Sequence, residues 1–410
     1  MPRFSTCLLL AVIVTNLFYF YTTKRNLARV EDFVAVNHEE SSFVAEDRRT
    51  RRGSSADRNR GSLSPVNPVA DESHAEPHLG DSLQNIANTT LGFERVFVIS
   101  LKDRMDKRDA LAVAASLTQI DLEWIDGVKL SDIPDRAYPS GWERDREKPN
   151  ELAAWRAHMN ALQTIVMNKI SSALILEDDC DWDVTLRTQL QEFARGTRAL
   201  QNSERNPRSP YGDNWRVLWL GHIGMIPQNQ SVAYEIPDDP TVRPWDLRAE
   251  NTWPDVADWP DLQQSRLIFD GAYGMGSLAY AVTYETARLI LAKLSMGETD
   301  NAFDFGLGDV CNDDYEGFHF HCFTPHPPLL SFWRKAGPAS GDSDIVDLGD
   351  DWHEAYSPSI TYSVMLNANR LASGAKMVEA QWPDVEQQMI DPAHLEIPQG
   401  RLISFDESDL

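Results

Sequence analysis

Three consecutive carboxylates end an apolar run in the stretch SSALILEDDCDWD, residues 171–183. Glu177, Asp178 and Asp179 repel one another when they stand side by side, so the arrangement is costly unless a cation compensates it. Side chains two residues apart on an extended segment point the same way. The spacing therefore predicts Glu177 and Asp179 as ligands of Mn²⁺ or Mg²⁺, which prefer oxygen ligands, and turns Asp178 back into the fold. A solvated acidic loop is the alternative interpretation.

The elements that must position this triplet alternate between strand-like and helix-like segments. Apolar runs at 95–101, 120–128, 173–176, 215–221 and 277–282 favour strands, and helical spacing is present at 102–117, 150–168 and 284–294. Asn150 and Thr283 precede two of these helices and are predicted as their N-caps. The alternation predicts an α/β fold with a mostly parallel sheet, flanking helices and right-handed crossovers.

Ligands of such sheets bind beyond the carboxyl ends of the strands. Four of the predicted strands end on ionisable groups, which are Arg104, Asp126, the triplet and His222. Polar groups therefore gather where the fold rule places a site, which favours a functional role for the triplet over a solvated loop.

Charge and composition restrict the ligand class. The 410 residues contain 38 Lys and Arg against 63 Asp and Glu, a formal net charge of −25. Such a surface repels phosphate backbones and argues against nucleic acid as a partner. Several of the 12 tryptophans lie between Trp215 and Trp259. Tryptophan at this density is typical of sugar-binding surfaces, and packing in the core or in loops is the alternative.

The N-terminal segment predicts membrane attachment. Residues 4–21 are almost all apolar and are flanked by basic residues on both sides. No small-residue cleavage site follows, so we expect a retained signal anchor over 1–23 with a lumenal C-terminal part in the Golgi or endoplasmic reticulum. Residues 24–90 have the composition of a disordered stem. Folded sequence is expected over 91–345, and the extension 346–410 is not assigned.

Two further patterns agree with a lumenal location. Asn88 and Asn229 begin Asn-x-Ser/Thr sequons. Cys311 and Cys322 bracket a short loop and could form a disulfide, which would leave Cys180 unpaired. The spacing leaves open whether this bridge forms.

Several segments, in their order along the chain, resemble glycosyltransferase family 25. They are VFVISLKDRMDKR, WIDGV, ELAAWRAHMNAL, ALILEDDCDW, WLGHIG, GSLAYAVTYETARLIL and GPASGDSDI, and they span about Phe93 to Ile345. The last three look most like fungal members. Glu151 and His158 match the family pattern, whereas Ala157 stands where the family usually has Ser.

This resemblance implies a GT-A-type fold and transfer of a sugar, with inversion, from a UDP-sugar to a glycan or glycoprotein acceptor. Galactose is the sugar implied at family level. A divalent metal held by carboxylates would neutralise the departing nucleoside diphosphate. Because Ala157 departs from the pattern, a non-catalytic sugar-binding or adhesion protein is the alternative. A metal-dependent hydrolase is a third reading, but a second ligand cluster and a nucleophile motif are both missing from the sequence.

The donor is expected to meet several of the groups named above. Arg104 and Arg108 stand one turn apart near a helix N-terminus and suit uracil or diphosphate contacts, although they could equally be a solvated helix face. Asp126 could bind uracil or ribose, or cap its Asp-Gly turn. The remaining predicted donor contacts are Glu151, Glu177, His222 and Arg334, the last as a diphosphate clamp with Lys335.

An inverting transfer also needs a base that takes the proton of the acceptor hydroxyl. Asp304 and Asp309 are the candidates, since both lie in the acidic run after the last predicted helix. His158 is a further candidate catalytic residue on the same helical face as Glu151, and a core histidine is its alternative reading.

Overall fold

The computed structural model describes residues 82–203, 206–228, 232–243, 262–312 and 321–404. All of them belong to one compact unit, Glu76–Leu410. The predicted anchor, almost all of the predicted stem and the Asn229 sequon lie outside the described residues. Among the described helices, none is long and apolar enough to cross a membrane.

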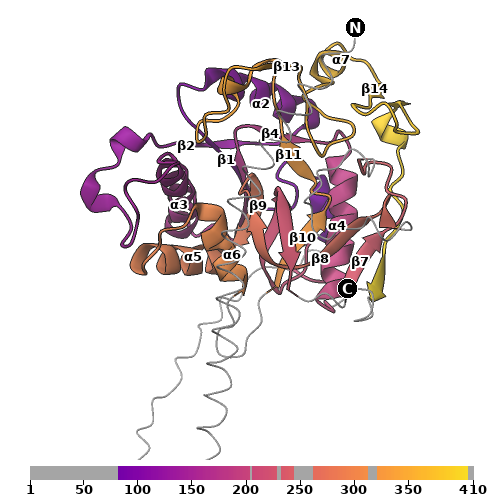
Figure 1. The fold of residues 1–410 in the computed structure, drawn as a ribbon. Coiled ribbons are helices and arrows are strands. Elements are labelled where there is room, and N and C mark those ends of the chain that lie inside the picture. The colour runs from indigo at the N-terminus through magenta and orange to yellow at the C-terminus, as the bar shows by residue number, and fades with distance from the viewer. Residues whose placement is uncertain (1–81, 204–205, 229–231, 244–261, 313–320, 405–410) are drawn as a thin grey trace, which may run out of the picture. The chain divides into compact units, whose positions relative to one another are not determined.

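A ten-stranded sheet forms the centre of this unit (Figure 1). The strand order is β16-β7-β8-β10-β5-β9-β3-β1-β2, and β6 pairs with β8. The strands are β1 (Arg95–Ser100), β2 (Glu123–Asp126), β3 (Ser172–Glu177), β5 (Trp215–Gly221), β6 (Gly224–Pro227), β7 (Val232–Ile236), β8 (Arg266–Met275), β9 (Ala279–Thr283), β10 (His321–His326) and β16 (Arg401–Ser404).

The sheet is mixed, which corrects the prediction of a mostly parallel sheet. β1 runs parallel to β2 and β3, and β5 runs parallel to β10. β9 lies antiparallel between β3 and β5, and β8 is antiparallel to its neighbours β6, β7 and β10. The error has a simple cause, because an apolar run predicts a buried strand but carries no information on its direction. The α/β class itself is confirmed.

Helices cover both faces of the sheet. They are α2 (Met105–Thr118), α3 (Glu151–Asn168), α4 (Leu186–Leu200), α5 (Tyr284–Met296), α6 (Phe303–Asn312) and the short α7 (Ala368–Ala372). Short 3₁₀ helices occupy Ser82–Ala87, Leu130–Asp132, Asp135–Ala137, Ala339–Gly341 and Pro392–His394. Figure 1 shows α3, α5 and α6 gathered on one side of the strands and α4 on the other.

The alternation of side chains along β3 explains this layering. Ala173 and Ile175 belong to the apolar core that α3, α5 and α6 complete, whereas Leu174 and Leu176 belong to the core on the side of α2 and α4. A strand that is apolar on both faces must be covered on both faces. β3 is therefore held rigidly, and its carboxyl end is a fixed platform for the triplet.

Helix α3 follows the predicted amphipathic pattern. Leu152, Trp155, Met159 and Leu162 are buried on its sheet-facing side. Asn150 occupies the N-cap position, as predicted, but its side chain makes no capping hydrogen bond and instead donates to the carbonyl of Asp344 at 3.0 Å. At α5 the predicted cap is confirmed, since Thr283 Oγ1 accepts from the backbone N–H of Thr286 at 3.2 Å.

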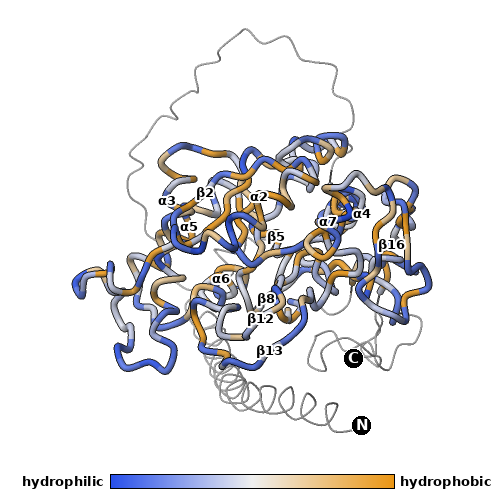
Figure 2. Tube along the Cα trace, turned by 90° about the horizontal axis from the view of Figure 1, so that it is seen from above, coloured by the Kyte–Doolittle hydropathy of each residue, from blue (hydrophilic) through white to orange (hydrophobic). Residues whose placement is uncertain are grey.

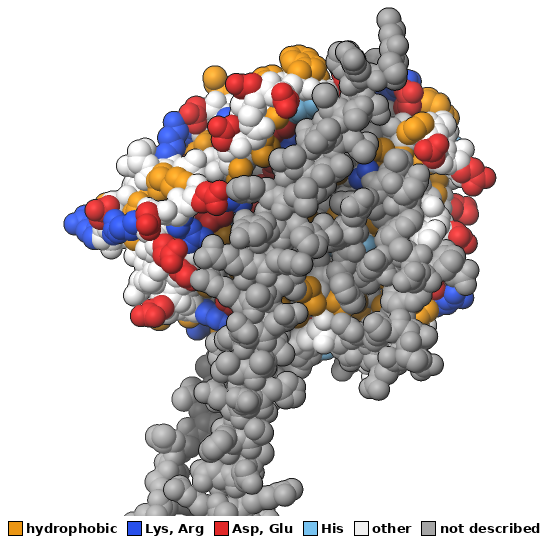
Figure 3. Space-filling view, viewed as in Figure 1, with side chains coloured by type: hydrophobic (Ala, Val, Ile, Leu, Met, Phe, Trp, Pro, Cys, Tyr) orange, Lys and Arg blue, Asp and Glu red, His pale blue; other side chains and the backbone are white. Residues whose placement is uncertain are grey.

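The C-terminal segment packs on the same unit. β16 extends the main sheet by pairing with β7. Three small two-stranded sheets join β4 (Cys180–Trp182) to β11 (Leu330–Phe332), β12 (Gly337–Pro338) to β13 (Trp352–His353), and β14 (Val378–Glu379) to β15 (Met389–Ile390). In Figure 2 the apolar stretches lie along the central strands and helices, and hydrophilic stretches form the outer loops. Figure 3 shows acidic and basic side chains interspersed on those parts of this face that are not drawn in grey.

Candidate functional site

The carboxylate triplet turns where β3 ends. Glu177 is the last residue of β3, Asp178 and Asp179 form a turn, and β4 begins at Cys180. The extended conformation that would send Glu177 and Asp179 in one direction is therefore not present. Instead, each carboxylate meets a basic side chain from a different part of the chain, which are His158 on α3, Lys107 on α2 and Arg334 after β11.

Glu177 is held by a closed set of hydrogen bonds. Its Oε1 accepts from Ser277 Oγ at 2.7 Å and lies 3.3 Å from His158 Nε2. His158 Nδ1 lies 3.0 Å from the hydroxyl of Tyr280. Because a carboxylate oxygen only accepts, Nε2 donates to Glu177, and in the neutral ring Nδ1 then accepts from the hydroxyl of Tyr280. Phe303 stacks on the imidazole at 4.3 Å between ring centroids, so the ring is fixed in orientation.

The surroundings keep Glu177 ionised. Burial alone would raise the pKa of Glu177, but the hydrogen bonds from His158 and Ser277 and the charge of Lys107 outweigh burial and lower it. Its side chain retains 27% exposure. Glu177 is therefore a carboxylate that is fixed through one oxygen and open to solvent elsewhere.

Asp178 is buried, as the sequence predicted, with only 8% exposure. Lys107 Nζ lies 3.0 Å from its Oδ1 and 2.8 Å from Asp344 Oδ2. Burial raises the pKa of Asp178 to about 6, and the ammonium of Lys107 opposes that effect. Lys107 therefore ties β3, α2 and the segment around Asp344 together.

Asp179 pairs with the predicted diphosphate clamp. Arg334 Nη1 lies 2.6 Å from Asp179 Oδ2, and both side chains are 13% exposed. The same guanidinium nitrogen donates to the carbonyl of Asp342 at 2.9 Å. Two backbone hydrogen bonds between Arg334 and Tyr356, at 2.9 and 3.0 Å, hold the arginine's own backbone. Residues that are 155 positions apart thus meet at the end of β3.

The two arginines near the start of α2 turn to different partners. Arg104 forms ion pairs with Asp344 at 2.5 Å and with Asp106 at 3.0 Å, and donates to the carbonyl of Gly341. Arg108 donates to the carbonyl of Ser100 and to Asp126, and its guanidinium lies 4.9 Å from the centre of the Trp124 ring. The structure therefore brings Arg104 toward the triplet network and Arg108 together with Asp126.

Four other predicted residues have contacts of their own. Glu151 pairs with Arg146 at 2.7 Å. His222 is buried and its Nε2 lies 2.9 Å from the carbonyl of Pro325, and burial lowers its pKa to about 4. A neutral, buried His222 of this kind has the contacts of a structural residue. Asp304 and Asp309, the two candidate bases, both lie on α6.

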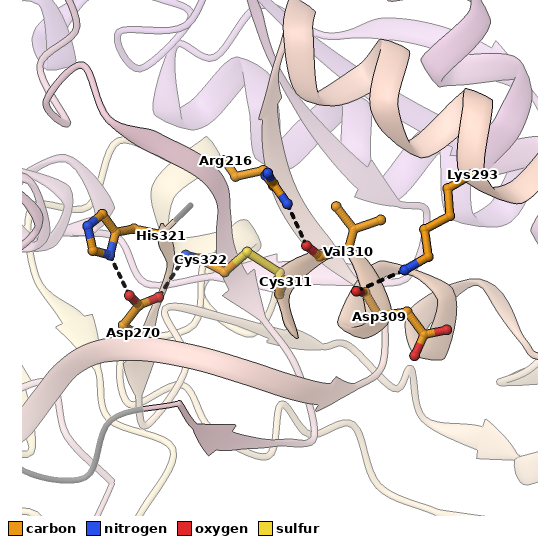
Figure 4. Close-up of a disulfide and its surroundings, with 8 residues drawn as sticks. All are labelled: Arg216, Asp270, Lys293, Asp309, Val310, Cys311, His321 and Cys322. Carbon is orange, nitrogen blue, oxygen red and sulfur yellow. Dashed lines mark hydrogen bonds and ion pairs between the residues drawn. A yellow bond between two sulfur atoms is a disulfide. The ribbon is translucent and has the colours of Figure 1, made fainter. Parts of the chain in front are cut away.

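Asp304 lies beside the Glu177 cluster. Its Oδ2 accepts from the backbone N–H of Gly276, the neighbour of Ser277, and the preceding residue Phe303 stacks on His158. Burial raises the pKa of Asp304. Asp309 lies farther along α6 next to Cys311, where its carbonyl accepts from Lys293 (Figure 4). Of the two candidate bases, Asp304 is therefore the one that we connect to Glu177 and His158, through Gly276 and Phe303.

The disulfide that the cysteine spacing left open is present in the structure. Cys311 and Cys322 form a disulfide that links the end of α6 to β10, and Cys180 is free and buried (Figure 4). Beside the bridge, the backbone N–H of Cys322 donates to Asp270, which also pairs with His321.

Two carboxylate oxygens of the triplet have the donor chemistry that Mg²⁺ and Mn²⁺ prefer. Glu177 Oε2 and Asp179 Oδ1 make no hydrogen bond to any described residue, and both are hard oxygen donors. The ion-pair network contains six carboxylates and four cations, which leaves two negative charges when the histidines are neutral. No three His, Cys, Asp or Glu side chains form a metal group among the described residues. Mg²⁺ commonly takes one or two carboxylates and completes its shell with phosphate and water.

Sequence reasoning missed three participants in this site. Lys107, Ser277 and Tyr280 carry the contacts to Asp178, Glu177 and His158. All three lie inside segments that had drawn attention for other reasons, the first after β1 and the other two at β9. A lysine on a helix and a serine before a strand are too common to single out before the sheet order is known.

The chain has a distant likeness to a known protein. No protein-family model matches the chain. The chain is 21% identical over 294 residues to a human protein named inactive glycosyltransferase 25 family member 3. The match covers 67% of this chain and 42% of that protein, so the chain spans about two fifths of the relative's length. The similarity is therefore distant and at the level of the family, and the relative's name describes it as inactive.

Proposed function

We propose that the chain is a glycosyltransferase that binds a UDP-sugar at the carboxyl end of β3 and transfers the sugar, with inversion, to a glycan or glycoprotein. The observation that carries the proposal is the triplet itself. Its three carboxylates are held by basic side chains from three separate parts of the chain. Lys107 and His158 lie in segments that resemble glycosyltransferase family 25, and Arg334 lies just before a third such segment. Galactose is the sugar that we would test first.

The cationic side chains around the triplet would hold the diphosphate. Arg334, Lys107 and Arg104 surround Asp179, Asp178 and Asp344, and each could exchange part of its carboxylate contact for a phosphate oxygen. Arg334 and Lys107 are mostly buried, so their charges are weakly screened by water. These properties suit a site for a dianionic ligand, once the negative charge that remains on the ion-pair network has been compensated.

Other residues would position the nucleoside and the acceptor. Arg108, Asp126 and Trp124 form a polar and aromatic wall at the ends of β1 and β2 that suits uracil and ribose. Glu177 would accept from a ribose hydroxyl or bind the metal. Asp304 is our candidate base. Burial raises its pKa, and a general base works best when its pKa lies near the working pH.

Mn²⁺ or Mg²⁺ is part of the proposal, with Glu177 and Asp179 as its protein ligands. When bound, such an ion would neutralise the charge that develops on the departing UDP. The two negative charges in excess within the ion-pair network support this role, because a nucleoside diphosphate would otherwise be repelled by them.

A Golgi or endoplasmic reticulum membrane location, through the apolar segment 1–23, completes the proposal. The Cys311–Cys322 disulfide supports it, since such bridges persist in oxidising compartments.

The second candidate function is a non-catalytic sugar-binding protein on the same fold. The name of the human relative favours it. The departure at Ala157 is weaker support, because Ala157 is 2% exposed and packs in the apolar core among α3 neighbours. The replacement therefore changes helix packing and leaves the described contacts of the triplet in place.

Release of UDP from a panel of UDP-sugars separates the two functions. Full-length protein with Mn²⁺ should hydrolyse one donor slowly in the absence of acceptor, and Asp179→Asn should reduce this rate by about 100-fold. Asp384→Asn, an exposed acidic residue remote in sequence, is the matched control and should leave the rate unchanged. A binding protein would bind UDP or the donor without turnover in either form.

A further inference from the structure

Asn88 begins a sequon that the candidate site does not use. Asn88, Thr89 and Thr90 follow the 3₁₀ helix Ser82–Ala87 and precede β1 by a few residues. Asn88 and Thr89 are exposed. The motif therefore lies on the surface, where its acceptor side chain is accessible to a modifying enzyme.

Hydrogen bonds fix which end of the Asn88 amide faces solvent. Its Oδ1 accepts from the backbone N–H of Thr90 at 2.9 Å, from the backbone N–H of Gly92 at 3.0 Å and from Thr90 Oγ1 at 3.1 Å. Because backbone N–H groups only donate, the atom they meet is the oxygen. The amide nitrogen Nδ2 makes no hydrogen bond to any described residue, so the reactive atom is the one left to solvent.

The disulfide supplies an independent observation on the compartment. Cys311 and Cys322 are bonded, and thiols of this kind stay reduced in the cytosol. An Asn-x-Thr motif is a glycosylation acceptor only where the chain passes through the secretory pathway. An exposed sequon and an oxidised cysteine pair thus point to the same compartment.

We propose that Asn88 carries an N-linked glycan. In the reaction, Nδ2 forms a bond to the anomeric carbon of an oligosaccharide carried on a lipid diphosphate. The bond between that carbon and the diphosphate oxygen breaks, the lipid diphosphate leaves with the electron pair, and one amide proton is lost to base. The site is independent of the proposed transferase activity.

Peptide mass analysis of the full-length chain, expressed in a eukaryotic host, tests the proposal. Trypsin releases residues 61–95 as one peptide, because no Lys or Arg lies between Arg60 and Arg95, and Asn88 begins the only sequon in it. We expect this peptide to carry a glycan, and an amidase that releases N-glycans should convert Asn88 to Asp.

Two variants make the assignment specific. Asn88→Asp keeps an oxygen for the turn but has no amide nitrogen, so it should fold and lose the glycan. Thr90→Ser keeps the hydroxyl and should retain the glycan. An unmodified 61–95 peptide would overturn the proposal, whether Cys311–Cys322 is oxidised or reduced in the same sample. Neither result depends on transferase turnover. An unmodified peptide would therefore overturn the glycosylation proposal without bearing on the proposed transferase function.

Discussion

Arg334 and Asp179 form an ion pair of 2.6 Å at the end of the central strand β3, and each side chain is 13% exposed. The pair joins the triplet to the segment that follows β11, and the backbone of Tyr356 holds the arginine in place. Arg334 gives this carboxylate its charge-assisted hydrogen bond, and the nearby ammonium of Lys107 adds a second positive charge. The pair therefore stabilises the fold, and its guanidinium is also the group that an anionic ligand would compete for.

Replacing Arg334 by Ala should lower the free energy of unfolding by about 1 to 3 kcal/mol, because Asp179 is then left mostly buried without its charge-assisted hydrogen bond. Urea unfolding with two probes measures the change. Arg95→Ala is the matched control, since Arg95 and Glu123 form an exposed pair at 2.9 Å that should contribute less than about 1 kcal/mol. Equal losses in the two variants would mean that the Arg334 pair is no more than a surface contact.

Asp183 makes folding stability depend on pH. It is 1% exposed, and burial raises its pKa to about 6, with the nearby charge of Asp239 adding to the effect against hydrogen bonds from Thr185 and Tyr362. A raised carboxyl pKa stabilises the fold below the unfolded value of 3.8, and this contribution is lost as the pH rises through 6.

The free energy of unfolding should therefore fall by about 1.4 kcal/mol between pH 5 and pH 7.5 through this group. Urea unfolding at several pH values measures the slope. Asp183→Asn should reduce the slope without abolishing it, because burial also raises the pKa of Asp178 and of Asp181 to about 6. A slope that the substitution leaves unchanged would show that another group is responsible.

Loss of the disulfide should destabilise the domain by about 2 to 3 kcal/mol, the size expected for a bridge that closes a short loop. The Cys311–Cys322 bridge spans 11 positions. Thermal unfolding with and without reductant measures the effect. The double variant Cys311→Ala/Cys322→Ala should show no response to reductant, because Cys180 is buried and unpaired. A response in the double variant would point to chemistry at the two remaining cysteines, Cys7 and Cys180.

Ser277 should matter for ligand binding more than for folding. Its hydroxyl donates to Glu177 at 2.7 Å, and Ser277→Ala removes a hydrogen bond to a charged group. We expect the affinity for the donor to fall about tenfold, measured by calorimetry, with a small change in stability. Ser277→Thr keeps the hydroxyl and should restore most of the affinity. If both variants bind alike, Ser277 does not position Glu177.

How much could be foreseen from the sequence depends on the range of the interaction. The helix around Leu152 and Met159 and the cap at Thr283 were predictable because their signals are local. The direction of β9 was not, since Ala279–Thr283 would be equally apolar in a parallel strand. The triplet was predicted as a site, and this stays a prediction. The turn at Asp178 and Asp179 was missed, because two aspartates after a strand suit an extended end or a turn.

The partners of the triplet show the same limit. Lys107 is 71 positions before Asp178 and Ser277 is 100 positions after Glu177, so no local pattern connects them. Arg334 was predicted near the diphosphate, but its pairing with Asp179 depends on the sheet order. His222 was predicted as a donor contact from its place at a strand end, and its hydrogen bond to Pro325 became visible only with β10 beside β5.

Calorimetric titration of UDP into the full-length protein, with Mn²⁺ and then with EDTA, tests the central claim most directly. We predict binding in Mn²⁺ that weakens by about 10- to 100-fold in EDTA and equally in Asp179→Asn, because both changes remove the contact that compensates the diphosphate. UDP binding of the same strength in all three cases would contradict the assignment of the triplet as a nucleotide-sugar and metal site.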